Sequence, residues 1–539
     1  MTVKSPTLEV ALAGVPASDS FVKGSTKVPL LGASFRAISA DVKLTTVKIS
    51  GTTASGSSST NINSELLSLG LYDGNTLISS LKSFSGSGTS TSPSTATFSN
   101  LNYTIPQGQT KILTVKADLS SGSTLNYRYS VAIADVADTT GVDVVAVDSE
   151  GREVVYSGDL VNTTTESQIV APTVGVTVLG AGSMTVVAAP DDTESKAGIV
   201  TANTTGVVLG KFRFTAASET MKVTKLQVLV NDSNSATATT TASSDEVSVI
   251  YLYDGAAQIA SGAITGTGTN AGVVYFENSN GLFEVAKDAT KTITVKGDTN
   301  SITGGADSSA SVFVHIVGSG GPGYDFEAKG TVSSDTTITA ASGKEKAVYK
   351  TKPTIAVQAP SNKLTGGSAP VIEFKITADA KEQVSFKAIT LDVSPTGATV
   401  TAPTTSNVTL RNVTTSSNLT LATTTGAAIV GGGTDQFALY LTNEESIPAG
   451  QTYTYRVSLT FSNVSATAGG ASVTTKLVRN ESTKAGATTY AAIADGGADE
   501  NPSFIWSDNS ATGHTESTLD WANGVLVETF PSDSISISN

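Results

Sequence analysis

The chain repeats one long pattern, and this internal repeat restricts its fold more than any other feature of the sequence. Residues 69–74 read Leu-Gly-Leu-Tyr-Asp-Gly, and residues 250–255 read Ile-Tyr-Leu-Tyr-Asp-Gly. Further along each copy, residues 109–118 (Gln-Thr-Lys-Ile-Leu-Thr-Val-Lys-Ala-Asp) correspond to residues 289–298 (Ala-Thr-Lys-Thr-Ile-Thr-Val-Lys-Gly-Asp). A unit of this length that recurs along a chain is a domain in a tandem array, and such arrays usually span a distance or cover a surface.

A third, more divergent copy occupies the C-terminal part of the chain. Residues 447–452 (Ile-Pro-Ala-Gly-Gln-Thr) match residues 105–110 (Ile-Pro-Gln-Gly-Gln-Thr). Phe35, Phe212 and Phe374 mark the same place in the three copies and define the period. We place the domain boundaries in polar connecting segments, which gives domains 1–170, 171–347 and 348–539.

Short segments in which apolar and polar residues alternate predict strands with one buried face. In the third copy, Ile372 and Ile376 are expected on the buried side with Phe374, whereas Glu373 and Lys375 are expected in solvent. The chain is rich in turn residues, with 50 glycines, and only 15% of its residues are charged. Each copy holds about seven to nine such segments, the number typical of an immunoglobulin-like sandwich. The sequence therefore predicts an all-β fold of three tandem immunoglobulin-like β-sandwich domains.

The repeated Tyr-Asp-Gly element predicts a hairpin turn. Asp73-Gly74 and Asp254-Gly255 each lie between apolar runs. We expect Asp and Gly to supply the two positive φ angles of a type I′ turn. The alternative is that Asp73 binds a cation, but one carboxylate without a nearby partner offers too few oxygen ligands.

Composition excludes several classes of function. A net charge of −14 repels nucleic acid, so we expect no nucleic-acid partner. No apolar run is long enough to cross a bilayer, and residues 1–4 do not begin the apolar segment of a signal peptide. With the Thr-rich, acidic surface, this favours a mature or trimmed extracellular form. The absence of cysteine excludes a Cys nucleophile and an iron–sulfur cluster.

Residues suited to catalysis are scarce. The chain has two histidines, His315 in an alternating segment and His514 in a polar loop, and neither adjoins a nucleophile motif. The Gly-rich stretch 318–323 lacks the Lys-Ser/Thr pair and the helix that a phosphate-binding loop needs. We therefore expect no enzyme activity, with no catalytic and no cofactor-binding residues.

Clustered carboxylates make calcium the one cofactor that the sequence leaves open. Such clusters occur at Asp148–Glu150, at Asp191–Glu194 and near residue 500. Calcium takes several oxygen ligands, often from neighbouring acidic side chains. The best candidate metal site consists of Asp495, Asp499 and Glu500. The alternative for each cluster is a solvated loop.

The repeated motifs resemble the tandem immunoglobulin-like β-sandwich repeats of bacterial and archaeal extracellular surface proteins, of the surface-layer or extracellular-filament subunit type. The residues that carry the resemblance are the Leu-Gly pairs before Phe35 and Phe212, the Leu-Tyr-Asp-Gly hairpins, and the Ile-Pro-x-Gly-x-Thr-Lys and Val-Lys-Ala-Asp segments. The resemblance covers nearly the whole chain, most closely in the first two copies. It implies a sandwich fold and an extracellular or cell-surface location. No anchoring motif is visible, so the mode of attachment is not assigned.

Three functional hypotheses follow. The first is an extracellular structural protein that binds copies of itself to form a filament or a surface-layer lattice. Thr7–Leu12 and Val525–Ser538 are the segments expected to cross between subunits, since a free sheet edge accepts a strand from another chain; the alternative is that each closes its own domain. The second is an adhesin that binds carbohydrate or a host or cell surface through its loops. The third is an accessory region of an enzyme.

The adhesin hypothesis assigns a role to the two tryptophans. Trp506 and Trp521 both lie in the C-terminal segment, and an exposed pair would stack on sugar rings of a cell-surface glycan. The alternative is that both side chains are buried in the core of the third domain.

Overall fold

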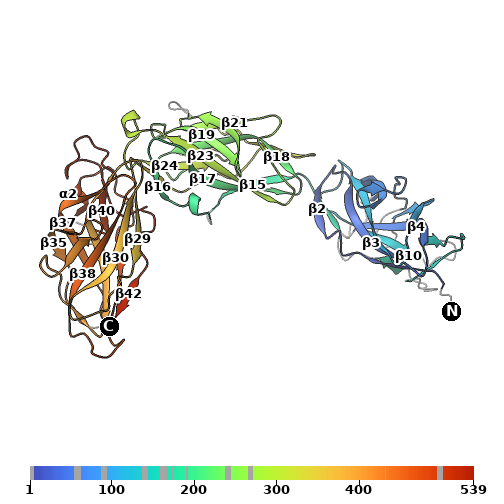
Figure 1. Ribbon diagram of the computed structural model, residues 1–539. Helices are drawn as coiled ribbons and strands as arrows, with labels where there is room; N and C mark the ends of the chain where they lie inside the picture. Colours follow the sequence, from blue (N-terminus) through green and yellow to red (C-terminus); the bar gives the residue numbers. More distant parts are fainter. Residues whose placement is uncertain are drawn as a thin grey trace.

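The computed structural model describes residues 5–53, 62–86, 94–135, 144–157, 167–170, 175–189, 192–236, 244–264, 271–430, 432–494 and 502–539. Within these ranges the chain is almost entirely β-structure, and the α-helices, α1 (Ile62–Glu65) and α2 (Tyr490–Ala494), are very short. The strands form six sheets, which fall into three pairs along the chain. Figure 1 shows three bodies in series, with the first and third on either side of the second. The all-β prediction is confirmed.

The first sandwich pairs two sheets that span residues 7–179. One sheet has the order β12 (Val155–Ser157), β1 (Thr7–Leu12), β3 (Val28–Ile38), β9 (Thr110–Leu119), β5 (Leu66–Asp73), β6 (Thr76–Leu77). The other has the order β11 (Val144–Val147), β4 (Val42–Thr53), β10 (Arg128–Asp135), β14 (Val176–Leu179), β2 (Asp19–Val22), with β13 (Ser167–Val170) on β10 and β7 (Ser94–Phe98) and β8 (Tyr103–Ile105) on β4.

The second sandwich repeats this arrangement. One sheet has the order β15 (Ser183–Ala188), β17 (Thr204–Ala217), β23 (Thr290–Thr299), β19 (Val247–Asp254), β20 (Ala257–Ala263). The other has the order β16 (Gly198–Thr201), β28 (Lys346–Tyr349), β24 (Ser311–Ile316), β18 (Met221–Asn231), β25 (Glu327–Lys329), β26 (Ser334–Asp335), with β21 (Val273–Glu277) and β22 (Phe283–Val285) on β18 and β27 (Ala341–Ser342) on β24. Two 3-10 turns, η1 (Thr193–Ser195) and η2 (Ile302–Gly304), precede β16 and β24.

The third sandwich diverges mainly in its added short strands. One sheet has the order β29 (Pro353–Gln358), β30 (Gly367–Ala378), β38 (Thr452–Ser462), β32 (Thr399–Val400), β36 (Ile429–Val430), with β33 (Thr409–Asn412) on β38 and β34 (Ser417–Leu419) on β33. The other has the order β35 (Leu421–Thr425), β37 (Asp435–Ile447), β31 (Val384–Thr396), β39 (Ser472–Leu477), β42 (Ile535–Ser538), with β40 (Phe504–Ser507) on β31 and β41 (Trp521–Ala522) on β40.

Apolar side chains from the facing sheets form one large core in each sandwich. Phe35, Phe212 and Phe374, which define the sequence period, are fully buried in the three cores. The predicted alternation in β30 is confirmed for its apolar residues, but Glu373 is buried rather than exposed. Its carboxylate accepts hydrogen bonds from Arg456 Nε (2.7 Å) and Gln358 Nε2 (2.6 Å), and these long neighbouring side chains cover it.

The Tyr-Asp-Gly hairpins are present, but their turns differ from the predicted type. In the pairing of β19 with β20, Asp254 lies opposite Ala257, so Gly255 and Ala256 form the two-residue loop. Gly255 has φ +60°, whereas Asp254 and Ala256 are not among the positive-φ residues. A positive φ at the first loop position alone is typical of a type II′ turn, so the type I′ prediction is wrong. The equivalent turn at Gly74 has the same φ of +60°.

The first two sandwiches end on a strand that the sequence did not indicate, whereas β42, which ends the third sandwich, lies within the predicted segment Val525–Ser538. β10 in the first sandwich, β24 in the second and β39 in the third are equivalent strands late in each copy. Each of these strands pairs with one further strand, namely β14, β28 or β42.

These last strands occupy equivalent places in the three sandwiches. β14 and β28 each run parallel to a short strand, β2 or β16, and in the third sandwich one backbone contact replaces that pairing. The equivalent hydrogen bonds are Lys23 N to Leu179 O (2.9 Å), Ala202 N to Tyr349 O (2.7 Å) and Leu364 N to Ser538 O (2.9 Å). Only residues 180–182 separate β14 from the next sandwich, and only residues 350–352 separate β28 from the third.

We expect Gly255→Ala to lower the free energy of unfolding by about 1–2 kcal/mol, because a Cβ is disfavoured at positive φ. Chemical denaturation monitored by fluorescence measures the change. Ala256→Gly serves as the matched control and should be neutral or slightly destabilising. Stabilisation by Ala256→Gly would contradict the type II′ assignment, since it would indicate a positive φ at residue 256.

Candidate functional site

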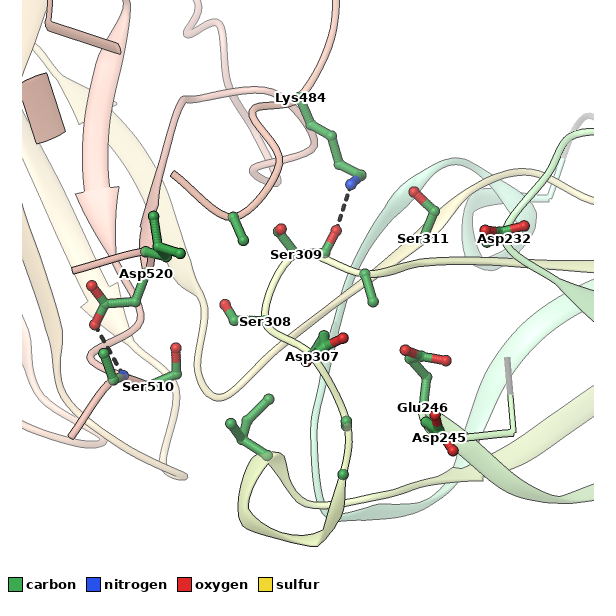
Figure 2. Close-up of a pocket in the computed structure, with 17 residues that line it drawn as sticks. Asp232, Asp245, Glu246, Asp307, Ser308, Ser309, Ser311, Lys484, Ser510 and Asp520 are labelled. Carbon is green, nitrogen blue, oxygen red and sulfur yellow. Dashed lines mark hydrogen bonds between the residues drawn. The ribbon is translucent and has the colours of Figure 1, made fainter. Parts of the chain in front are cut away.

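A large acidic cavity lies where the second sandwich meets the third. It has a volume of about 840 Å³ and is lined by residues of both sandwiches. Figure 2 shows Asp245, Glu246 and Asp307 on the side of the second sandwich, and Asp520 with Lys484 on the side of the third. Four lining carboxylates come from the second sandwich, and Lys484 is the basic residue among the lining side chains.

The strand ends of the second sandwich bring its four carboxylates together. Asp232 directly follows β18, Asp245 and Glu246 directly precede β19, and Asp307 lies in the loop before β24. These loops emerge at the same end of the sandwich because β18 runs antiparallel to β24. The acidic character of the cavity therefore arises from residues that are far apart in the sequence.

Crowding of like charges and partial burial affect the proton affinity of Glu246. Burial is the largest effect and raises the pKa of Glu246 to about 7, although a backbone hydrogen bond opposes it. The negative charges of Asp245, Asp307 and Asp232 raise this pKa further. Near neutral pH, a proton on Glu246 therefore relieves repulsion within the cavity.

Hydrogen bonds around the cavity hold the two sandwiches together. Ser308 Oγ donates to Asp508 Oδ2 (2.9 Å), and the backbone N–H of Lys350 donates to the same oxygen (2.7 Å). Lys484 Nζ donates to the carbonyl oxygen of Ser309. Burial raises the pKa of Asp508, and the three hydrogen bonds that its carboxylate accepts oppose this rise. The cavity is thus the polar part of a joint.

Asp520 lies on the opposite wall of the cavity, and both of its carboxylate oxygens have polar partners. Its Oδ2 accepts from Ala511 N (3.1 Å) and contacts His514 Nδ1 (2.8 Å), and its Oδ1 accepts from Thr518 Oγ1 (2.6 Å). His514 Nε2 lies 2.8 Å from Glu444 Oε2. The predicted polar loop around His514 is therefore an ordered network.

The cavity does not assemble a metal-binding group of side chains. Among the described residues, no three or more His, Asp and Glu side chains lie close enough together to hold a metal ion. The predicted calcium site at Asp495, Asp499 and Glu500 lies outside the described residues. We therefore assign the cavity no metal.

The other predicted carboxylate clusters have structural roles where they are described. Asp148 Oδ1 accepts from the backbone N–H groups of Glu150 and Arg152 (both 2.9 Å) and shapes a tight turn. Lys211 forms ion pairs with Asp192 (2.7 Å) and Glu194 (2.5 Å). The solvated-loop interpretation was incomplete, because Asp148 also holds the backbone of its turn and Asp192 and Glu194 also hold the Lys211 side chain.

His315 belongs to the core of the second sandwich. Its Nε2 lies 3.0 Å from both Asn231 Oδ1 and the carbonyl oxygen of Ser233. Burial lowers the pKa of His315 to about 4, so the ring is neutral at physiological pH. The residue fixes the loop that follows β18, a role that the alternating pattern alone could not indicate.

The two tryptophans are buried, which removes the sugar-stacking site of the adhesin hypothesis. Trp506 is fully buried and its Nε1 donates to Asn523 O (2.9 Å), while its ring lies 5.0 Å from that of Tyr349. Trp521 is equally buried and its Nε1 donates to Thr515 O (2.9 Å). The alternative of burial in the third core is confirmed for Trp506, whereas Trp521 is buried in a separate small cluster with Ala388 and Ile505. Sequence reasoning missed that Tyr349, the last residue of β28, brings Trp506 into contact with the second sandwich.

The chain has only distant similarity to known proteins. No protein-family model and no curated protein matches the chain. Among solved structures, a protein of Corynebacterium diphtheriae provisionally described as membrane-anchored is 10% identical, with 99% of this chain and 91% of that chain covered and a TM-score of 0.18. A tetra-tandem repeat from the extending region of a large adhesion protein is 13% identical, with 88% and 95% covered and a TM-score of 0.14. A type II cohesin dyad of Acetivibrio cellulolyticus is 11% identical, with 64% and 98% covered and a TM-score of 0.14.

The described helices were compared with the length and hydropathy of a membrane-spanning helix. None of them is both long and apolar enough to cross a lipid bilayer.

We expect Glu246→Gln to flatten the dependence of thermal stability on pH between pH 4.5 and about pH 7. The folded-state pKa lies above the ordinary value, so the folded chain binds this proton more tightly than the unfolded chain. The contribution of Glu246 to stability is therefore fully present below pH 4.5 and is lost as the pH rises through about 7.

Scanning calorimetry across this pH range measures the melting temperature of both chains. Glu150→Gln, at an exposed turn residue, is the matched control and should keep the wild-type slope. His315 contributes a slope of opposite sign between about pH 4 and pH 6.5, which overlaps this range and is common to all variants. Equal slopes for Glu246→Gln and wild type would contradict the assignment.

Proposed function

We propose that this protein is an extracellular structural protein whose copies assemble into a filament or a surface-layer lattice. The observation that supports this most is the construction of its joints. In the first and second sandwiches, the last strand leads directly into the first strand of the next sandwich. Only residues 180–182 lie between them at the first joint, and only residues 350–352 at the second. Short connections between packed domains restrict their relative motion, and a chain of such domains acts as a spacer.

The joint between the second and third sandwiches is continuous with the core of the third. Ile199, Ala347 and Tyr349 belong to strands of the second sandwich, yet they pack within the hydrophobic cluster of the third. Lys346 on the same strand is buried, and its Nζ donates to the carbonyl oxygens of Glu194 (2.7 Å) and Lys196 (2.6 Å). Burial lowers the pKa of Lys346 to about 8. A joint with a shared core is stiff because bending it would expose apolar surface.

The joint between the first and second sandwiches includes a contact made by one lysine. Lys287, in the turn before β23, forms an ion pair with Asp19 at the start of β2. Its ammonium group also lies 3.5 Å from the centroid of the Phe21 ring. A cation held by both a carboxylate and an aromatic face gives this contact a defined geometry.

Strand exchange between copies is part of the proposal. In the single chain, β1 lies between β3 and β12, and β42 forms the edge of its sheet next to β39. Both segments therefore pair within their own sandwich here. An exchanged assembly would keep the same pairing and supply the strand from a neighbouring copy, which is the low-cost route to oligomers.

Deletion of residues 1–13 should abolish polymers if β1 is the exchanged strand, and negative-stain microscopy of the purified chain would show this. Because β1 buries Leu8, the deletion also opens the first sandwich, so a synthetic peptide of residues 1–13 is added back as a second arm. The peptide should restore the folded sandwich but not the polymers. Deletion of residues 1–4 is the matched control. Polymers that persist without residues 1–13 would rule out exchange of β1.

Stiffness of the second joint is tested by Tyr349→Ala. Removal of this ring from Trp506 should broaden the distance distribution between the second and third sandwiches. The chain has no cysteine, so spin labels at Glu284→Cys and Ser417→Cys are unique, and pulsed double electron–electron resonance measures the distribution. Tyr275→Ala, at a half-exposed tyrosine away from the joint, is the control. An unchanged distribution in Tyr349→Ala would contradict a joint held by this contact.

A further inference from the structure

Strand β20 gives the second sandwich an open sheet edge. β20 is the last strand of its sheet and pairs with β19 on one side. No strand of the described chain pairs with its other side. An unpaired edge carries backbone donors and acceptors that another strand can complete.

The register identifies which backbone groups face outwards. Ile264 N donates to Ser248 O, so this pair is hydrogen-bonded to β19. Partners in an antiparallel ladder alternate between hydrogen-bonded and non-hydrogen-bonded pairs. Ser261 and Ala263, which lie opposite Tyr251 and Val249, therefore direct their N–H and C=O groups away from the sheet.

The exposed edge lacks the features that usually block edge pairing. β20 reads Ala-Gln-Ile-Ala-Ser-Gly-Ala over seven residues and contains no charge and no proline. Natural sheets protect such edges with charges, proline or short strands. The side chains of Ser261 and Ala263 are small and exposed, so a second backbone can approach closely.

The equivalent edges of the other sandwiches are shorter. The counterpart in the first sandwich, β6, has two residues, and the chain then returns to the same edge, where Lys82 bridges to Leu69. The counterpart in the third sandwich, β34, has three residues. Only the second repeat leaves a long uncharged edge among these three equivalent strands, so the edge is not a property of the fold itself.

We propose that β20 pairs with β20 of a second copy in antiparallel orientation about a two-fold axis at Gly262. In this register Ser261 of each copy lies opposite Ala263 of the other, and the outward backbone groups of both residues are satisfied. A second copy is the occupant that the charge distribution favours. Two chains of net charge −14 repel each other except where their contact surfaces are uncharged, and β20 is uncharged.

This inference rests on the proposal that copies self-associate, but it concerns a contact that does not involve the terminal strands. Pairing of β20 with β20 would join two chains through their second sandwiches, whereas exchange of β1 would join them through their first sandwiches. The two contacts can therefore be tested separately in one chain.

The test measures the dimerisation of the full chain by sedimentation equilibrium. Ser261→Lys and Ala263→Glu should each weaken the dimer about tenfold, because each places like charges near the two-fold axis. An equimolar mixture of the two variants should regain the wild-type affinity, since the introduced lysine of one copy then faces the introduced glutamate of the other. Thr76→Lys, on the exposed β6, is the control and should dimerise like wild type.

Amide hydrogen exchange provides a second readout that does not depend on substitution. Exchange at Ser261 and Ala263 should slow as the protein concentration rises, while exchange at Gly262, which faces β19, should not change. A chain that stays monomeric, or a dimer that tolerates both charged variants, overturns the inference. If the dimer forms as described but no filament or lattice is seen, this contact stands and the proposed function fails.

Discussion

Backbone pairing of the last strand in each sandwich is the interaction on which the architecture depends. β14 and β28 each complete a sheet of one sandwich and lead within three residues into the first strand of the next. The hydrogen bonds that fix a sheet therefore also fix a joint. A flexible connector would leave the three cores independent, whereas here the third core extends into the second sandwich through Ile199 and Tyr349.

Charged side chains at these joints follow from the same constraint. A carboxylate that is buried at a joint accepts several hydrogen bonds. Asp508 accepts from Ser308 of the second sandwich and from Ser510 of the third, and Glu219 accepts from Val332 N and Ser333 N (both 3.1 Å). Glu65 before β5 accepts from Thr124 N (2.9 Å), while Glu246, in the same place before β19, faces three aspartates. The first two copies thus share a glutamate at this position but place it in different surroundings. Glu65 accepts a backbone hydrogen bond from a loop, whereas Glu246 lies in the acidic cavity.

Much of the fold could be predicted because the alternation of apolar and polar residues along a short segment indicates a strand. The Tyr-Asp-Gly hairpins, the buried phenylalanines and the all-β class all follow from spacing within a few residues. The prediction failed where a feature depends on a distant partner. Glu373 alternates as an exposed residue, yet Arg456 and Gln358 cover it; the turn at Gly255 is set by the register of two strands rather than by the dipeptide. The candidate site was not predictable at all, since Asp232, Glu246 and Asp307 meet only after three strand ends converge.

The sequence by itself determined the strand periodicity, the repeat and the acidity of this protein, because these are properties of neighbouring residues and of composition. Only the tertiary structure decided that Trp506 is a joint residue, that four carboxylates share one cavity, and that the outer side of β20 pairs with no strand of the described chain. Those outcomes depend on which segments lie side by side. Sheet pairing selects these neighbours through backbone hydrogen bonds, which every residue offers alike and which therefore leave little trace in the side-chain sequence.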